Sequence, residues 1–108
     1  MRLFSRRPKQ GTHTPDQSSA QRRAEVVAHF REFATTREGV EAYIEPPTPN
    51  DPTTMVLVAR TGEWTRRRIS DRKAAWALAR DLELPVYDVN LTGYPSSMRR
   101  WSAAQRRK

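Results

Sequence analysis

Apolar residues recur at helical spacing between residues 18 and 37 and predict the first element of the chain. Ser18 followed by Gln21 fits a capping box, in which the two side chains bond the backbone at a helix start. Gly39 stands where a helix commonly ends in a left-handed turn. The pattern therefore predicts a helix over 19–37. The residues of its apolar stripe are Val26, Val27, Phe30, Phe33 and Ala34.

Three strands are expected after this helix. Residues 40–45 alternate between apolar and polar positions, which is typical of a strand buried on one face only. A proline-rich loop separates them from 55–59, a continuous apolar run that predicts a central strand covered on both faces. Thr61-Gly62 predicts a tight hairpin turn. Residues 63–69 form a third strand, whose polar composition favours a place near an edge.

The second half of the chain predicts a helix, a strand and a final helix. Ser70 or Asp71 would cap the second helix, and Leu84-Pro85 would end it. Residues 86–91 alternate again and predict a fourth strand, and 97–107 predict a short C-terminal helix. The inner face of the second helix is expected to carry Ala74, Ala75, Leu78, Ala79 and Leu82, and the core side of the fourth strand Tyr87, Val89 and Leu91. Met98, Trp101 and Ala104 would share a side of the C-terminal helix.

This order of elements predicts an α+β two-layer sandwich: helix, three antiparallel strands, helix, strand, with basic terminal tails. Both long helices carry an apolar stripe that matches one face of the sheet, so we expect them to pack on that face. Residues 1–17 lack an apolar period and are expected to form a disordered basic arm. The folded domain would span 18–95, and 96–108 would be a basic helical tail.

The charge of the chain lies mainly at its ends. The formal net charge is +8. Residues 1–23 hold six basic side chains and one acid, residues 99–108 hold five and none, and residues 24–98 hold nine against eleven acids. Cationic ends attract polyanions such as nucleic acid, although they also keep a small domain soluble. Arginine outnumbers lysine 17 to 3, which suits phosphate recognition or reflects a genomic habit.

No catalytic or cofactor-binding constellation is visible in the sequence. The absence of cysteine excludes a thiol nucleophile and any Cys-ligated metal. The four glycines fit no phosphate-binding motif. His13 falls in the expected arm, and His29, near Glu25 and Glu32, is expected on a solvated helix face with ion pairs. We therefore expect a protein that is not an enzyme and has no cofactor or metal.

The most suggestive local feature is a basic–aromatic run on the third strand. Alternation puts Trp64, Arg66 and Arg68 on one outward face, where a tryptophan beside guanidiniums would make a platform for bases and phosphates. The alternative is internal: the tryptophan lies over its own arginines, which pair across strands with Glu41 and Glu45.

Two further basic segments complete the candidate nucleic-acid site. Arg72 and Lys73 open the second helix. The C-terminal tail would either order on nucleic acid or dock on the domain through Met98 and Trp101, leaving its arginines solvated. Its candidate contacts are Arg99, Arg100, Trp101, Arg106, Arg107 and Lys108.

Segments 62–68 (GEWTRRR), 84–95 (LPVYDVNLTGYP) and 98–99 (MR) resemble a small conserved actinobacterial protein family of unknown role. The likeness covers about residues 38–101 and implies an intracellular bacterial protein, with no activity to carry over.

Two folds also resemble the expected element order. Residues 19–83 are similar in order to the double-stranded-RNA-binding domain, whose second helix starts with basic residues as Arg72 and Lys73 do here, although Asp71 departs from that pattern. The order also resembles restriction-endonuclease-like nucleases. That family's Glu-x-Lys would fall on Glu63-Trp64-Thr65, where threonine replaces lysine, so its magnesium site is not expected.

Together these features predict a non-enzymatic, cytoplasmic protein that associates with nucleic acid, with RNA or ribonucleoprotein favoured over DNA. The alternative is a protein–protein interaction adaptor that uses the sheet edge near Trp64 or the C-terminal helix.

Overall fold

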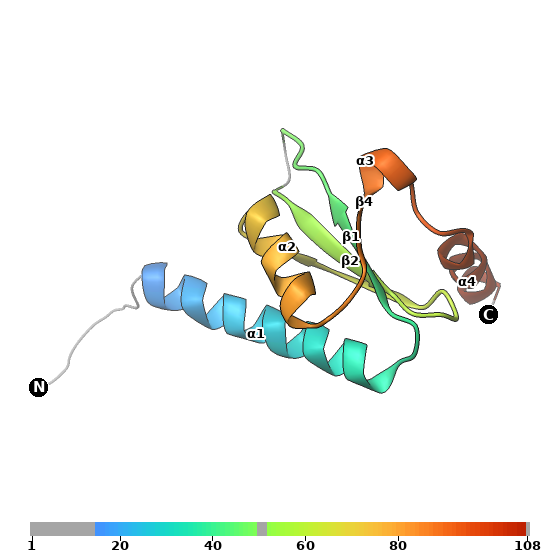
Figure 1. Cartoon of the computed structure of the whole chain (residues 1–108), viewed down its shortest axis with the longest axis horizontal. Helices are drawn as coiled ribbons and strands as arrows, with labels where there is room; N and C mark the ends of the chain where they lie inside the picture. The colour runs from blue at the N-terminus through green and yellow to red at the C-terminus, as the bar shows by residue number, and fades with distance from the viewer. Residues whose placement is uncertain (1–14, 50–51, 108) are drawn as a thin grey trace, which may run out of the picture.

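The structure, a computed structural model, describes residues 15–49 and 52–107, and its centre is a four-stranded sheet (Figure 1). The elements are α1 (Pro15–Thr36), β1 (Glu41–Glu45), β2 (Thr54–Val58), β3 (Trp64–Arg68), α2 (Arg72–Asp81), β4 (Val86–Asp88), α3 (Val89–Thr92) and α4 (Ser96–Arg106). This arrangement confirms the predicted α+β class. Residues 1–14 of the predicted arm 1–17, Asn50-Asp51 and Lys108 lie outside the described residues.

The strands follow the order β3-β2-β1-β4, which places β3 at an edge as its polarity predicts. The first three strands pair antiparallel, with Tyr43 opposite Val56 and Val56 opposite Arg66. β4 pairs parallel to β1, so the sheet is mixed. Ala59 and Glu63 close the β2–β3 hairpin through a backbone hydrogen bond of 2.8 Å at the predicted turn.

The main core lies between the sheet and the helices α1 and α2, which cover the same face (Figure 1). Phe30 and Phe33 of α1 are buried there, and Ala75 and Ala79 of α2 are fully buried. Asp71 caps α2 by accepting a hydrogen bond of 2.7 Å from the backbone N–H of Ala74. The predicted stripe of α2 is confirmed, and that of α1 is confirmed for Val26, Phe30 and Phe33, whereas Val27 and Ala34 lie outside this core. The strand residues of this core are Ala42, Ile44, Met55 and Leu57, and Val40 and Ala59 adjoin β1 and β2.

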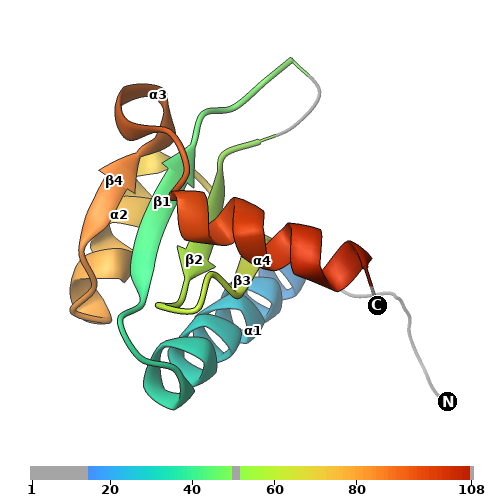
Figure 2. The same ribbon diagram turned by 90° about the vertical axis from the view of Figure 1, so that its right-hand side faces the viewer.

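The opposite face of the sheet is also covered in part. Figure 2 shows α4 crossing this face, on the side away from α1. Tyr43, Val56, Val58 and Met98 form a second buried cluster beneath it. The prediction that β1 is buried on one face only is therefore wrong. Tyr43 points away from α1 and is nevertheless buried, with only 6% of its surface exposed. The α4 helix adds a partial third layer to the predicted sandwich.

Two predicted boundaries are also wrong. Helix α1 begins at Pro15, before the expected start, and takes in the last three residues assigned to the arm. Proline suits the first helical turn because an N–H at that position would have no intrahelical partner.

The fourth strand stops at Asp88 instead of running to residue 91. The Asp88 side chain accepts a hydrogen bond of 2.8 Å from the backbone N–H of Asn90 and caps the short helix α3. As a result Leu91, expected in the core, is 84% exposed. Asp88 is thus both the last strand residue and a helix cap, a double role that alternation alone does not reveal.

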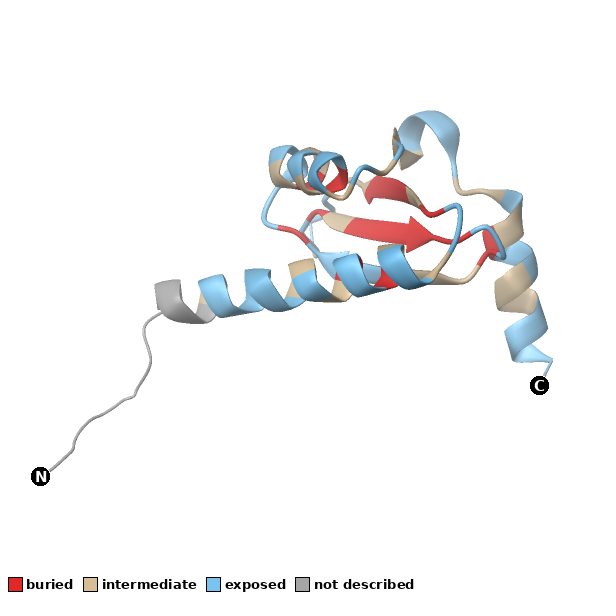
Figure 3. Cartoon of the chain, turned by 60° about the horizontal axis from the view of Figure 1, so that its bottom comes forward, coloured by how far each residue is buried: buried red, intermediate tan, exposed pale blue. Residues whose placement is uncertain are grey.

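The N-terminal half of α1 extends past the sheet (Figure 3). Residues 20–25 of this half are exposed, whereas Phe30 and Phe33 lie under the sheet. No helix in the described ranges is long and apolar enough to span a membrane.

Candidate nucleic-acid interface

Trp64 and Arg66 lie on the face of β3 that alternation predicts, but both are engaged inside the protein. The indole Nε1 of Trp64 donates a hydrogen bond of 2.8 Å to Ser102 Oγ on α4. The Arg66 guanidinium lies 5.2 Å from the centre of the Trp64 ring and forms two hydrogen bonds of 2.8 Å with the Glu45 carboxylate. The internal alternative for these two residues is therefore the arrangement that the structure shows.

Glu45 is the centre of this cluster. Besides Arg66, the hydroxyls of Thr54 and Tyr94 donate to its carboxylate, whose side chain is only 12% exposed. Burial alone would raise the pKa of Glu45. The hydrogen bonds from Arg66, Thr54 and Tyr94 together have the larger effect, so the pKa of Glu45 is lowered. Glu41, the second predicted partner, instead accepts a hydrogen bond of 2.9 Å from Tyr43. One acid therefore neutralises the middle of the predicted platform.

Arg68 and its neighbour Arg67 remain exposed at the far end of β3. Neither forms an ion pair with any residue in the described ranges. Arg67 donates a hydrogen bond of 2.7 Å to the backbone carbonyl of Arg66. Together with Arg66, Thr48 and Tyr94, they line a surface hollow of about 590 Å³. This end of β3 can receive an anion.

Arg72 and Lys73 do not join Trp64 on a common face. They open α2, which packs on the α1 side of the sheet, whereas Trp64 contacts α4 on the opposite side. Arg72 also pairs with Asp88, whose pKa is lowered mainly by this hydrogen bond. Lys73 is exposed. The single contact patch expected from the sequence is thus divided between two layers, because β3 and α2 are adjacent in the chain but present different faces.

The C-terminal helix carries the largest group of exposed cations, which we call the α4 arginine stripe: Arg99, Arg100, Arg106 and Arg107. The helix docks through Met98, which is 8% exposed, while Trp101 is partly buried. Its docking confirms the alternative in which the tail packs on the domain. Helical geometry puts Arg99 in line with Arg106, and Arg100 in line with Arg107, about 10.5 Å further along the axis.

The arginine stripe has no acidic partner in the described part of the chain. Arg100 donates a hydrogen bond of 3.1 Å to Ser96 Oγ one turn earlier, and the sequence of α4 contains no Asp or Glu. The four guanidiniums therefore lie on the solvent side of a helix that the sheet holds in place. Lys108, the last predicted contact, lies outside the described residues.

Sequence reasoning missed a second basic surface on the α1 side of the sheet. Arg22 and Arg23 of α1 and Arg67 and Arg68 of β3 line one groove between α1 and α2. Alternation does place Arg67 on the α1 face, so part of this signal was readable. The sequence does not predict that Arg22 and Arg23 of α1 join this groove, because their position depends on the angle at which that helix leaves the sheet.

His29 is held by a neighbour and not simply solvated. Its Nε2 lies 2.7 Å from Thr65 Oγ1, and the pKa of the imidazole is lowered by burial and by the nearby Arg67. Among the described residues, no three His, Cys, Asp or Glu side chains gather as metal ligands would.

Comparison with known proteins returns no matching family model, no similar curated protein and no similar solved structure. The geometry of the molecule is therefore the basis for any statement about function.

Proposed function

We propose that this protein associates with nucleic acid, and that the α4 arginine stripe is its main contact with the phosphate backbone. The observation that carries the proposal is the set of four exposed guanidiniums on a helix docked through Met98. Four such groups on one rigid element can contact several phosphates at once, and the bound state requires no folding of the tail.

The contacts available to this stripe favour binding that does not depend on base sequence. Guanidiniums that meet phosphates fix position and affinity but do not read bases. Trp64 and Arg66 are already satisfied by Ser102 and Glu45, so they are not offered as base contacts. Arg67 and Arg68 supply a second cationic point at the end of β3. Our expectation that RNA is preferred to DNA belongs to this proposal and is tested with it.

Two contacts bear on the surfaces considered for a protein adaptor. Met98 of α4 is buried against the sheet, and the backbone carbonyl of Arg66 on the edge strand accepts a hydrogen bond from the Arg67 side chain. Charged side chains on an edge strand also discourage the addition of another strand. Neither surface provides an observation that favours the adaptor over nucleic acid.

The test is a fluorescence-anisotropy titration of the full chain with a labelled single-stranded RNA and, separately, a duplex DNA, over a range of salt. One variant replaces the four arginines of the stripe with alanine. A matched control removes the same number of charges from other exposed positions. The control residues are Arg23, Arg31, Arg60 and Arg80.

We expect the stripe variant to lose most of the salt dependence on RNA. Each neutralised phosphate contributes about 0.7 to the log–log slope on single strands, so four lost contacts lower it by about 3. The control should keep most of the wild-type slope. Equal losses in the two variants would show that net charge alone drives binding, and an unchanged slope in the stripe variant would reject α4 as the contact.

A further inference from the structure

A groove with an apolar floor and a basic rim lies between the N-terminal half of α1, the end of β3 and the start of α2. Its volume is about 630 Å³. The floor is formed by Val26, Val27, Ile69, Ala74 and Leu78, and the rim by Arg22, Arg23, Arg67 and Arg68. The N-terminal half of α1 projects beyond the sheet (Figure 3), and Val26, Val27, Ala74 and Leu78 of the floor are only partly buried. We call it the α1–α2 groove.

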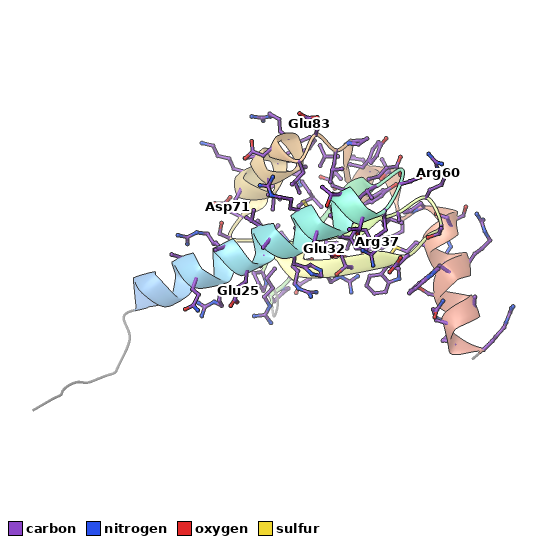
Figure 4. The ribbon with its side chains drawn as sticks, turned by 90° about the horizontal axis from the view of Figure 1, so that it is seen from below. Glu25, Glu32, Arg37, Arg60, Asp71 and Glu83 are labelled. Atoms are coloured by element: carbon purple, nitrogen blue, oxygen red, sulfur yellow. The ribbon has the colours of Figure 1, made fainter. Side chains whose placement is uncertain are left out.

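The charge around the groove is one-sided. Among the residues that the structure describes, no aspartate or glutamate lines the groove. Figure 4 shows Glu25 and Glu32 together on one flank of α1 and Asp71 beyond the other flank. Asp71 already caps α2 through the N–H of Ala74. An occupant of the groove therefore meets arginines at its edges and aliphatic carbon at its base.

We propose that the α1–α2 groove binds an acidic amphipathic helix of another protein. Carboxylates of that helix would contact the rim arginines, and its aliphatic side chains would cover Val26, Val27 and Leu78. Helices commonly bind in this way, with one apolar face laid into a groove between two elements. Opposite charges at the rim would add orientation and faster association.

Charge and chemistry disfavour the other occupants. Residues 1–14 hold four basic side chains and no acid, so repulsion from the rim opposes their entry. A second copy of a chain of net charge +8 meets the same repulsion. Nucleic acid lacks aliphatic groups to cover the floor, and the lining contains no aromatic ring on which a base could stack. An acidic, aliphatic protein segment satisfies both the rim and the floor.

The test uses three synthetic helical peptides of equal length, titrated into the full chain while amide and side-chain NMR shifts are followed. The first peptide carries leucines on one face and glutamates on the other. The second keeps the glutamates and replaces leucine with serine, and the third keeps the leucines and replaces glutamate with lysine. Only the first peptide matches both the floor and the rim.

Two variants of α1 give a matched pair. Val27→Asp puts a carboxylate on the groove floor, at a position outside the buried core cluster. Ala28→Asp adds the same charge one residue along, on the exposed outer side of α1. We expect the Leu/Glu peptide to bind with a Kd below about 1 mM, and Val27→Asp to weaken it at least about tenfold. Ala28→Asp should change the Kd by less than about twofold, since its charge faces solvent.

Several outcomes would overturn the proposal. One is equal binding of the Glu/Ser peptide, which would leave only electrostatic attraction. Another is equal weakening by the two α1 variants, and a third is RNA binding that Val27→Asp abolishes. The α4 stripe variant separates this proposal from the first one. It should lose RNA binding and keep the peptide, so either function can fail without the other.

Discussion

Replacement of Glu45 by glutamine should destabilise the protein far more than the loss of an ordinary surface ion pair. Glutamine keeps the shape of the side chain but removes the charge and turns one acceptor oxygen into a donor. Arg66, Thr54 and Tyr94 all donate to this carboxylate, so at least one of them loses its acceptor. The free-energy cost depends on how far the cluster is shielded from water.

The exposed fractions set the magnitude. The side chains of Glu45 and Arg66 are 12% and 42% exposed, so the pair lies between a surface pair and a buried one. Surface pairs contribute about 0–1 kcal/mol, and breaking a buried pair costs about 3–5 kcal/mol. We expect Glu45→Gln to lower the free energy of unfolding by about 2 kcal/mol, which moves the urea midpoint down by about 1 M.

The matched control is Glu38→Gln. Glu38 pairs with Arg60 at 3.2 Å, but the two side chains are 84% and 72% exposed. Loss of this pair should cost less than about 0.5 kcal/mol. Urea denaturation of the three proteins at neutral pH, followed by tryptophan fluorescence, compares them directly.

Wild type and Glu45→Gln also test how the free energy of unfolding depends on pH. Because folding lowers the pKa of Glu45 from its usual 4.5, its carboxylate stabilises the folded state above that pH. This contribution disappears as pH falls through the folded-state pKa, so the difference between wild type and Glu45→Gln should shrink below about pH 4.5. A difference that is small at neutral pH, or constant down to acid pH, would refute the role given to Glu45.

Two backbone features give further predictions. Gly62→Ala should displace α4, because an added Cβ would lie 2.1 Å from the carbonyl oxygen of Ser97, whereas the control Gly93→Ala has a positive φ too but open space around it. In urea denaturation, the loss of unfolding free energy should be about 1–3 kcal/mol larger for Gly62→Ala, and equal losses would argue against this contact. Asp71→Ala should cost about 1 kcal/mol through the lost cap on the Ala74 N–H, and Asp71→Asn should retain most of that stability; similar thermal midpoints for the two variants would contradict the capping role.

The part of the fold that could be predicted is the part coded by local periodicity. Phe30 and Phe33 indicate the buried side of α1, and the apolar run from Met55 to Ala59 indicates a strand covered on both faces. The polar sequence of β3 indicates an edge because a central strand with that composition would bury unpaired charge. Each of these features needs only neighbouring residues to be read.

The docking of α4 could not be predicted from periodicity. It rests on Met98 and Tyr43, which are distant in the sequence, and on the close approach of Gly62 to Ser97. A methionine on a short basic helix is equally consistent with a free tail. The hydrogen bond from the Trp64 indole N–H to Ser102 favours the docked helix over a free tail, but this contact is known only from the structure.

The sequence predicts which face of β3 the candidate residues occupy, but not which of the candidate residues lie together. Alternation gave the correct face for Trp64 and Arg66, and Glu45 was a foreseeable partner for that arginine. The sequence groups Arg72 with them as a basic residue at the start of the second helix. The helix that it opens packs on the other side of the sheet, where Asp88 comes within reach only after β4 has paired with β1.

The distribution of paired and unpaired arginines locates the positive field better than the net charge does. In the described part of the chain, Arg37, Arg60, Arg66 and Arg72 are bound to acids, and all four belong to the body of the domain. The α4 arginine stripe folds back onto that same body, yet the helix docks through Met98 and through Ser102, not through ion pairs. Folding therefore neutralises four arginines of the body, whereas the α4 arginine stripe forms no ion pair among the described residues. The α4 arginine stripe and the apolar floor of the groove lie on opposite sides of the sheet, so loss of the stripe should leave binding of an acidic helix intact, and Val27→Asp should leave RNA binding by the stripe intact.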